Sequence, residues 1–266
     1  KANGGTALTI DSYKNVADTL FERGVSDKLF EIDKITVNTE FSDFGPAFYG
    51  NKIVFASSDN SVNEFEDKSV DLAGWDKQPF LDLYQVAVDE EMNLKEAEPI
   101  KGDINTKYHE STAVFSKDGN TMYFTRNNFL DGKKKRDKDF VIRLKVYKAT
   151  KSGDSWGNIK ELPFNSDNYS VGHPALSANE DRLYFASDMP GTVGMSDIWY
   201  VDILGGESYS EPVNMGGTIN TVGRETFPFV STEDNLYFSS DGHKGLGGLD
   251  IFVTKITENS HGEIAT

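Results

Sequence analysis

Four stretches of the chain share one pattern of hydrophobic and polar positions. In each, a short apolar run with a central phenylalanine ends in small polar or acidic residues: residues 53–59, 122–127, 183–188 and 236–241. Aromatic and aliphatic runs that end in turn-forming residues predict β-strands. The central phenylalanines are 69, 61 and 53 residues apart. This spacing suits a β-propeller blade of about 40–50 residues with inserted loops.

Other positions of the repeat predict three more strands in each blade. The inner strand comes first and often opens with proline, which loses no ladder hydrogen bond at a strand's first residue: residues 46–49, 113–116, 174–177 and 228–231. A third strand follows a variable loop, at residues 82–86, 145–149, 197–201 and 250–254. The fourth strand ends on a recurring Asn-Thr or Asn-Ser pair, which we call the fourth-strand echo. The pattern therefore predicts an all-β fold, a β-propeller with four four-stranded blades at about 43–106, 110–166, 172–221 and 226–257.

The same fourth-strand echo precedes the first blade, at residues 37–39. The chain thus starts with a fourth strand and stops after a third one. A strand at about 30–38 would supply the outer strand of the last blade and remove an open sheet edge. Alternatively, it belongs with further blades that follow Thr266 in the natural protein, which the small number of blades favours. We expect residues 1–28 to be a linker or N-terminal extension and residues 29–266 to form the propeller.

The charge balance narrows the class of partner. Acidic residues outnumber basic ones by 43 to 27, which gives a net charge of −16. Such a field repels a phosphate backbone, so no nucleic-acid partner is expected. One basic cluster, formed by Lys133, Lys134, Lys135, Arg136 and Lys138, is interrupted by acidic residues and is interpreted as a solvated loop tip. No run of about 18 apolar residues predicts a membrane span, so no direct membrane insertion is expected.

The chain carries few signatures of catalysis. A Gly-x-Ser-x-Gly elbow and a Walker loop are both absent from the sequence, and no cofactor is expected. Asp82, Asp197 and Asp250 stand just ahead of third strands, where an aspartate commonly accepts backbone N–H groups of the preceding loop. Asp241 and Asp250 flank a glycine-rich loop and are weak calcium candidates, because only its two ends are acidic. The sequence therefore predicts no metal site and no enzyme, although its many carboxylates leave a glycosidase pair open.

Candidate binding residues lie on the loops that a propeller presents at its rim. Two long inserts, residues 57–81 and 127–141, are the predicted binding loops, because binding residues concentrate on loops held by a rigid scaffold. His109 and His173 both precede predicted inner strands and are expected near the same rim. The complete set of predicted binding residues is Trp75, Phe80, Trp156, His109, His173, Arg126 and Arg224.

Several segments carry a family resemblance: residues 41–48, 109–111, 115–128 and 239–252. Together they resemble the periplasmic WD40-like (TolB-type) propeller repeats. More narrowly, they are similar to the propeller of Bacteroidetes OmpA-family proteins, a group that includes a component of the type IX secretion system. The resemblance covers about residues 29–256. One departure is Lys145, which stands where the other blades hold an aspartate.

The resemblance implies a non-catalytic periplasmic scaffold associated with the outer membrane. Its partners would be cell-envelope proteins, and it would contact peptidoglycan only through a domain not present in this chain. The alternative is a propeller that binds or cleaves glycans.

Overall fold

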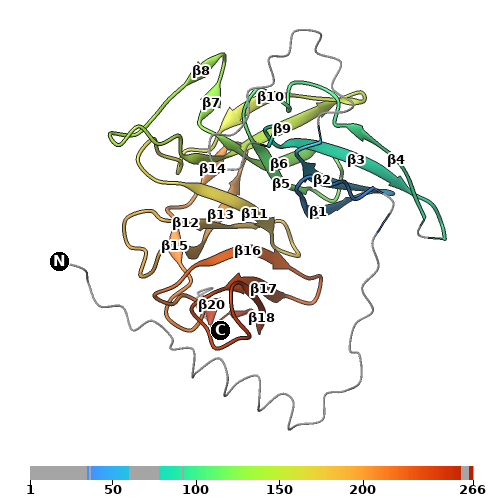
Figure 1. The fold of residues 1–266 in the computed structure, drawn as a ribbon. Helices are drawn as coiled ribbons and strands as arrows, with labels where there is room; N and C mark the ends of the chain where they lie inside the picture. The colour runs from blue at the N-terminus through green and yellow to red at the C-terminus, as the bar shows by residue number, and fades with distance from the viewer. Residues whose placement is uncertain (1–34, 36, 60–77, 92, 259–263, 266) are drawn as a thin grey trace.

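The computed structural model describes residues 35, 37–59, 78–91, 93–258 and 264–265, and these residues form strands, turns and loops. Four antiparallel sheets follow one another along the chain and make a four-bladed β-propeller (Figure 1). The all-β propeller prediction is thereby confirmed. Among the described residues there is no helix, and hence none that is long and apolar enough to cross a membrane.

The blades differ in how many strands they hold. Blades 1 and 2 have four strands each: β1 (Asp43–Tyr49), β2 (Lys52–Ser57), β3 (Asp82–Val88) and β4 (Leu94–Pro99), then β5 (Glu110–Phe115), β6 (Thr121–Asn127), β9 (Leu144–Ser152) and β10 (Ser155–Glu161). Blade 3 has β11 (Val171–Leu176), β12 (Arg182–Ser187) and β13 (Asp197–Gly205), with the short β14 (Ser208–Tyr209) and β15 (Val213–Asn214) both paired to β13. The described part of blade 4 has three strands: β16 (Glu225–Val230), β17 (Asn235–Ser240) and β18 (Asp250–Lys255).

Two small hairpins stand outside these sheets, β7 (Phe129–Leu130) with β8 (Lys133–Lys134) and β19 (Thr257–Glu258) with β20 (Ile264–Ala265). The predicted outer strand at 30–38 lies largely outside the described residues. Val37, which belongs to it, packs on the face of blade 1 formed by Phe55, Tyr84 and Val86.

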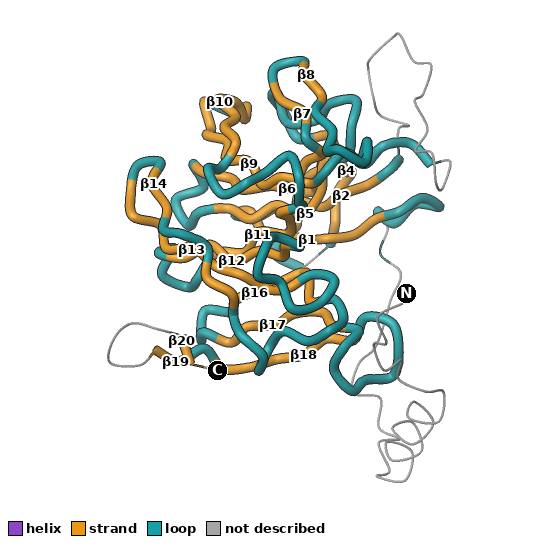
Figure 2. The backbone as a smooth tube through the Cα atoms, turned by 90° about the vertical axis from the view of Figure 1, so that its left-hand side faces the viewer, coloured by secondary structure: helices purple, strands orange, loops and turns teal. Residues whose placement is uncertain are grey.

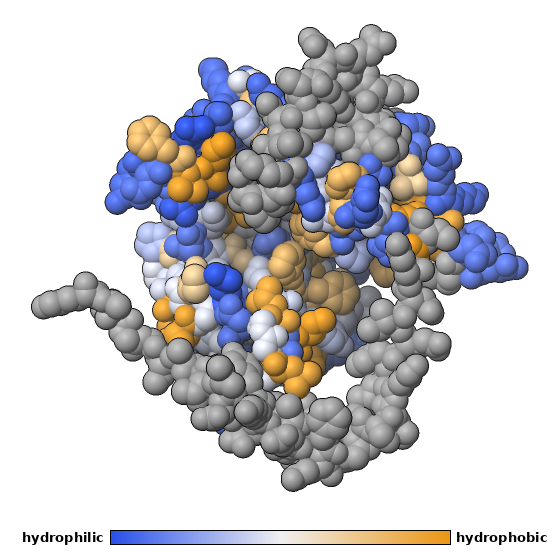
Figure 3. Space-filling view, in the orientation of Figure 1, coloured by the Kyte–Doolittle hydropathy of each residue, from blue (hydrophilic) through white to orange (hydrophobic). Residues whose placement is uncertain are grey.

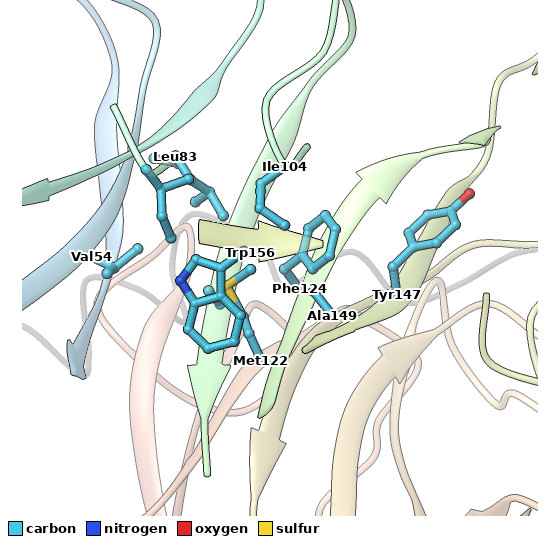
Figure 4. Packing of buried hydrophobic residues seen from close by; sticks show 11 residues of the cluster. Val54, Leu83, Ile104, Met122, Phe124, Tyr147, Ala149 and Trp156 are labelled. Atoms are coloured by element: carbon cyan, nitrogen blue, oxygen red, sulfur yellow. The ribbon is translucent and has the colours of Figure 1, made fainter. Parts of the chain in front are cut away.

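Apolar cores lie between neighbouring blades, because the inner strands β1, β5, β11 and β16 pack side by side in that order (Figure 2). Between blades 1 and 2, Leu83 and Ile104 meet Phe124 and Trp156, and all four side chains are almost fully buried (Figure 4). Similar clusters lie between blades 2 and 3 and between blades 3 and 4. Each sheet therefore buries both of its faces where a blade stands on either side.

At each of these contacts between blades, an asparagine side chain binds the backbone N–H and carbonyl of one residue in the third strand. Asn105 accepts a hydrogen bond from the backbone N–H of Leu83 (2.8 Å) and donates one to its carbonyl (3.0 Å). Asn165 and Asn220 form the same pair of bonds with Val146 and Ile198. The Asn-Thr and Asn-Ser echoes of the sequence are thus side-chain clamps on the third strand.

The face of blade 4 that points away from blade 3 packs against no other sheet of the described residues. Ile251 of β18 is 77% exposed, whereas the residues at the same position of the other third strands, Leu83, Val146 and Ile198, are fully buried. At the other end of the row of four blades, Phe48 of blade 1 is 75% exposed. Blades 4 and 1 meet near the axis, where the rings of Phe44 and Phe227 lie 6.4 Å apart.

The inner strands begin earlier than the proline pattern predicts. β1, β11 and β16 each start three residues before their proline, and a β-bulge in all four inner strands adds one residue near this point. The prolines Pro46, Pro174 and Pro228 lie within these bulges. A bulge leaves a residue outside the regular ladder, so proline is tolerated there as well as at a strand's first position.

Candidate functional site

The four bulges form a hub around the propeller axis. Each places one residue in the left-handed backbone region: Gly45 (φ 65°), Thr112 (φ 27°), His173 (φ 57°) and Phe227 (φ 50°). Glycine adopts this conformation without strain, whereas the other three do not. Backbone strain that recurs at equivalent positions shows that the surrounding packing holds it in place.

Side chains of the hub contact one another across blades 2, 3 and 4. The hydroxyl of Thr112 lies 3.2 Å from Nδ1 of His173 and 2.8 Å from the hydroxyl of Thr125. The backbone N–H of His173 donates to the Thr125 hydroxyl (2.8 Å). The His173 ring packs on Phe227, with ring centroids 4.0 Å apart. Burial lowers the pKa of His173 to about 4, so its imidazole is neutral at pH 7.

A funnel of about 830 Å³ opens beside this hub. Residues of all four inner strands line it, together with Tyr237, Phe238, Ser239 and Ile251 of blade 4. The lining is predominantly apolar, and it contains no carboxylate, lysine or arginine among the described residues that form it. The funnel can therefore accommodate an apolar group, but it offers no pair of carboxylates for acid–base chemistry.

We expect the stability of the protein to depend on pH through His173. Its folded-state pKa lies below the value of about 6.5 for an unfolded chain, so its contribution is fully present above pH 6.5 and is lost as the pH falls toward 4. The loss should be about 1–2 kcal/mol, less than the full shift implies, because His173 is only half-buried. Urea unfolding of wild type and His173→Gln at several pH values checks this. Parallel stability curves for the two proteins would contradict it.

A second group of side chains lies on the rim where blades 1 and 2 meet. Phe80 packs on His109 (ring centroids 4.6 Å apart) and on Tyr108 (6.0 Å), and Tyr108 packs on Phe129 (4.8 Å). The Nζ atoms of Lys107 and Lys134 lie 5.9 and 5.5 Å from the centroid of the Tyr108 ring. All four rings are half-buried and both lysines are exposed. We call these six residues the rim cluster.

Phe129 and Lys134 belong to the β7–β8 hairpin, which the sequence builds locally. Asp131 (φ 51°) and Gly132 (φ 74°) form its turn, and left-handed backbone at both positions is typical of a two-residue type I′ turn. The return of the hairpin is fixed by the Asp137 carboxylate, which accepts the backbone N–H groups of Asp139 and Val141 at 2.8 Å. Arg143 holds the same carboxylate through two nitrogens at 2.7 Å.

We call residues 127–141 the basic hairpin. Its Lys133, Lys134, Arg136 and Lys138 are exposed, while Asp137 is buried. Hydrophilic and hydrophobic surface lie side by side at the upper left of Figure 3, where Figure 1 places β7 and β8. The basic cluster therefore lies on a two-stranded hairpin, and its cations are exposed to solvent as the sequence predicts.

The structure distributes the predicted binding residues over several environments. Phe80 and His109 meet in the rim cluster, and Nδ1 of His109 accepts the backbone N–H of Leu81 at 3.1 Å. His173 lies in the hub, inside β11, so the two histidines do not share the rim position expected for them. Arg224 is exposed and lies 3.7 Å from Asp241. Trp75 is outside the described residues.

Trp156 and Arg126 lie in the core, away from the rim where the sequence placed them. Trp156 is 2% exposed and packs on Tyr49 and Phe115 between blades 1 and 2. Arg126 is also 2% exposed and pairs with Glu110, which is fully buried, at 2.9 Å. Burial raises the pKa of Glu110 and lowers that of Arg126, and each partner's charge opposes the other's shift. Neither residue is available to a partner.

The carboxylates ahead of the third strands hold loop backbone. Asp197 accepts the N–H groups of Val193 (2.9 Å) and Gly194 (3.2 Å), and Asp250 accepts that of Gly247 (3.1 Å). Asp241 accepts the backbone N–H of Arg224 at 2.6 Å. In blade 2, the buried Lys145 takes this position and pairs with Glu161 (2.5 Å) and Asp167 (2.7 Å). No metal-binding group of three or more His, Asp or Glu side chains occurs within the described ranges.

Sequence reasoning missed the hub bulges and most of the rim cluster. The hairpin had a usable signal, because Asp131-Gly132 stands between the short pairs 129–130 and 133–134. The contact of Tyr108 with Phe129 had none, since it joins the blade 1–2 connection to a loop of blade 2.

No protein-family model matches the chain, and no curated protein sequence matches it. Solved structures similar to it include TolB from Acinetobacter baumannii, with 14% identity and a TM-score of 0.44 over 82% of this chain and 42% of that one. A gluconolactonase from Xanthomonas campestris has 15% identity and a TM-score of 0.46 over 82% and 66%. A thermostable family-43 glycoside hydrolase has 10% identity and a TM-score of 0.46 over 86% and 94%. The chain thus spans less than half the length of TolB, and the mixed activities of these proteins assign none to it.

Proposed function

We propose that this propeller is a non-catalytic scaffold that binds protein partners through its rim. The observation that carries the proposal is the placement of its carboxylates. Those at the heads of inner strands are engaged by the connection that precedes each strand and by side chains of their own blade, and the axial funnel has an apolar lining. An acid–base catalyst needs a carboxyl or imidazole within hydrogen-bond reach of a bound substrate.

The inner-strand carboxylates show this engagement in three blades. Asp43, Glu110 and Glu225 each accept the backbone N–H and the hydroxyl of a threonine four residues earlier, at 2.7 to 3.0 Å. Ser57 and Ser240 add hydroxyl donors to Asp43 and Glu225, both at 2.6 Å. These bonds fix the strand ends and leave the carboxylates little capacity for a substrate.

The rim offers exposed charges next to aromatic rings, which the hub lacks. The rim cluster combines half-buried aromatic rings with exposed cations, and aromatic residues are enriched at the centres of protein interfaces. Two of its members, Phe129 and Lys134, stand on a hairpin fixed by Asp137 and Arg143, so binding would order few additional groups of the backbone.

The family resemblance extends the proposal to a cellular setting. On this basis the chain is the propeller of an OmpA-family protein of the periplasm, associated with the outer membrane. Its partners are other cell-envelope proteins, including components of a type IX secretion system. Contact with peptidoglycan would come from another domain of such a protein. The resembling segments, residues 41–48, 109–111, 115–128 and 239–252, support this assignment.

Two measurements test the scaffold. The immobilised chain should capture a defined set of proteins from an envelope extract of the source organism, and free chain in excess should compete them away. A panel of chromogenic glycosides and glycans should show no turnover above a heat-denatured control. Turnover that is abolished by replacing a single acidic residue would overturn the proposal in favour of a glycan-active propeller.

A further inference from the structure

The basic hairpin carries cations that the rest of the described structure leaves unpaired. Lys135 pairs with Asp167 at 3.6 Å, and Arg143 is held by Asp137 and Asp188. By contrast, none of Lys107, Lys133, Lys134, Arg136 and Lys138 forms an ion pair with any described carboxylate. Four of these five cations lie within six consecutive residues, 133–138, of a chain that has 43 acidic residues.

The acidic residues of the hairpin do not neutralise these cations. Asp137 is committed to Arg143 and to two backbone N–H groups. Asp131 and Asp139 are exposed, but the four unpaired cations of the hairpin, Lys133, Lys134, Arg136 and Lys138, outnumber them. The hairpin therefore presents a local positive potential on a protein of net charge −16. Complementary potentials steer encounters and select partners at protein interfaces.

Apolar groups adjoin the cations on the same loop. Phe140 is 77% exposed and Val141 is 45% exposed. Tyr108 lies under the ammonium groups of two lysines, and it packs on Phe129. A partner that joined carboxylates to an apolar side chain would satisfy both kinds of group at once.

Resting on the proposed function, we propose that the basic hairpin and the rim cluster bind an acidic segment of a partner protein, one that carries an aromatic or aliphatic anchor among its carboxylates. A nucleic acid is the other ligand that cations and aromatic rings suit. A long polyanion, however, would extend past the hairpin into the negative field of the remaining protein. A short acidic peptide remains within reach of the hairpin.

The test uses a short fluorescein-labelled peptide of glutamate and phenylalanine, and fluorescence anisotropy reports its binding. The test variant is Lys133→Glu/Lys134→Glu/Arg136→Glu. The control variant is Lys95→Glu/Lys101→Glu/Lys244→Glu, which makes the same change in net charge at exposed lysines elsewhere. We expect the test variant to bind at least about tenfold more weakly than wild type, while the control stays within about threefold. Thermal unfolding of both variants checks that the fold is unchanged.

Further probes separate the two parts of the ligand. Phe140→Ala should weaken binding of the glutamate–phenylalanine peptide more than that of a glutamate–alanine peptide. Added salt should weaken binding of both peptides, because the attraction is between exposed charges. A thymidine oligonucleotide of equal charge serves as the probe for the other ligand class.

Three outcomes would overturn the inference. The first is equal loss of binding in the test and control variants, and the second is tighter binding of the oligonucleotide than of the peptide at physiological salt. The third is no measurable peptide binding by the wild-type chain while it still captures envelope proteins; the scaffold function would then stand without this docking site.

Discussion

Replacing Arg126 with methionine is expected to lower the free energy of unfolding by about 3–5 kcal/mol. Glu110 is fully buried and Arg126 is 2% exposed, with Nε and Oε1 2.9 Å apart. Methionine fills much of the same space but leaves the carboxylate without its cation. The change also removes the bonds from Arg126 to the carbonyls of Asp103 (3.1 Å) and Ile104 (2.5 Å), which tie β6 to the connection before blade 2.

Urea unfolding of wild type and Arg126→Met measures this loss. Lys160→Met is the matched control, because Lys160 forms its ion pair with Glu207 where their side chains are 45% and 61% exposed. Such a surface pair should contribute less than about 1 kcal/mol. The double variant Glu110→Leu/Arg126→Met should recover part of the loss, because it no longer buries an unpaired carboxylate. Equal effects of Arg126→Met and Lys160→Met would show that the buried pair is not critical.

The other blades show why this pair was hard to predict. At the position of Arg126 they hold Ser57, Ser187 and Ser240, and opposite these stand Asp43, Val171 and Glu225. In sequence, a serine followed by a carboxylate is interpreted as part of a turn. An arginine at the end of a strand is interpreted as an exposed binding residue, because arginine is seldom buried. Aligning the inner-strand acids of blades 1, 2 and 4 with the strand-end residues opposite them would have paired Arg126 with Glu110.

The strands themselves were accessible to sequence reasoning. The four apolar runs with a central phenylalanine form β2, β6, β12 and β17. Their central phenylalanines occupy equivalent positions opposite the third strands. This succeeded because a blade buried on both faces needs apolar residues at successive positions of its central strands, which leaves a clear pattern. A repeated pattern is also read four times, so a weak signal in one blade is corrected by the others.

Contacts between blades were much less accessible. Trp156 was expected as an exposed binding residue because tryptophan is enriched among interface anchors, yet it fills the space between blades 1 and 2 beside Tyr49. The backbone of Gly102 approaches it so closely that a Cβ there would lie 2.0 Å from the Trp156 carbonyl oxygen. Such a fit joins residues more than fifty positions apart, and no local pattern records it.

The asparagine clamps were partly predictable. Their recurring Asn-Thr and Asn-Ser pairs were visible in the sequence, but the hydrogen bonds that the asparagines form were not. Asn220 is 3% exposed; its Oδ1 accepts from the N–H of Ile198 (2.8 Å) and its Nδ2 donates to the Ile198 carbonyl (3.0 Å). Asn220→Ala should destabilise the protein by about 2–3 kcal/mol. The Ile198 carbonyl keeps the N–H of Met215, so most of the cost comes from the buried N–H that loses its acceptor.

Asn220→Asp distinguishes the clamp from simple packing, because it keeps the shape and the acceptor while it removes the donor. Its carboxylate would face the Ile198 carbonyl and the side-chain oxygen of Asn214, which now accepts from Asn220 at 2.8 Å. Protonation would restore a donor, so Asn220→Asp should regain stability relative to wild type as the pH falls through its pKa. Asn93→Ala, at an exposed loop asparagine, is the control and should cost less than about 0.5 kcal/mol. If Asn220→Ala matched that control in urea unfolding, the clamp would contribute nothing to stability.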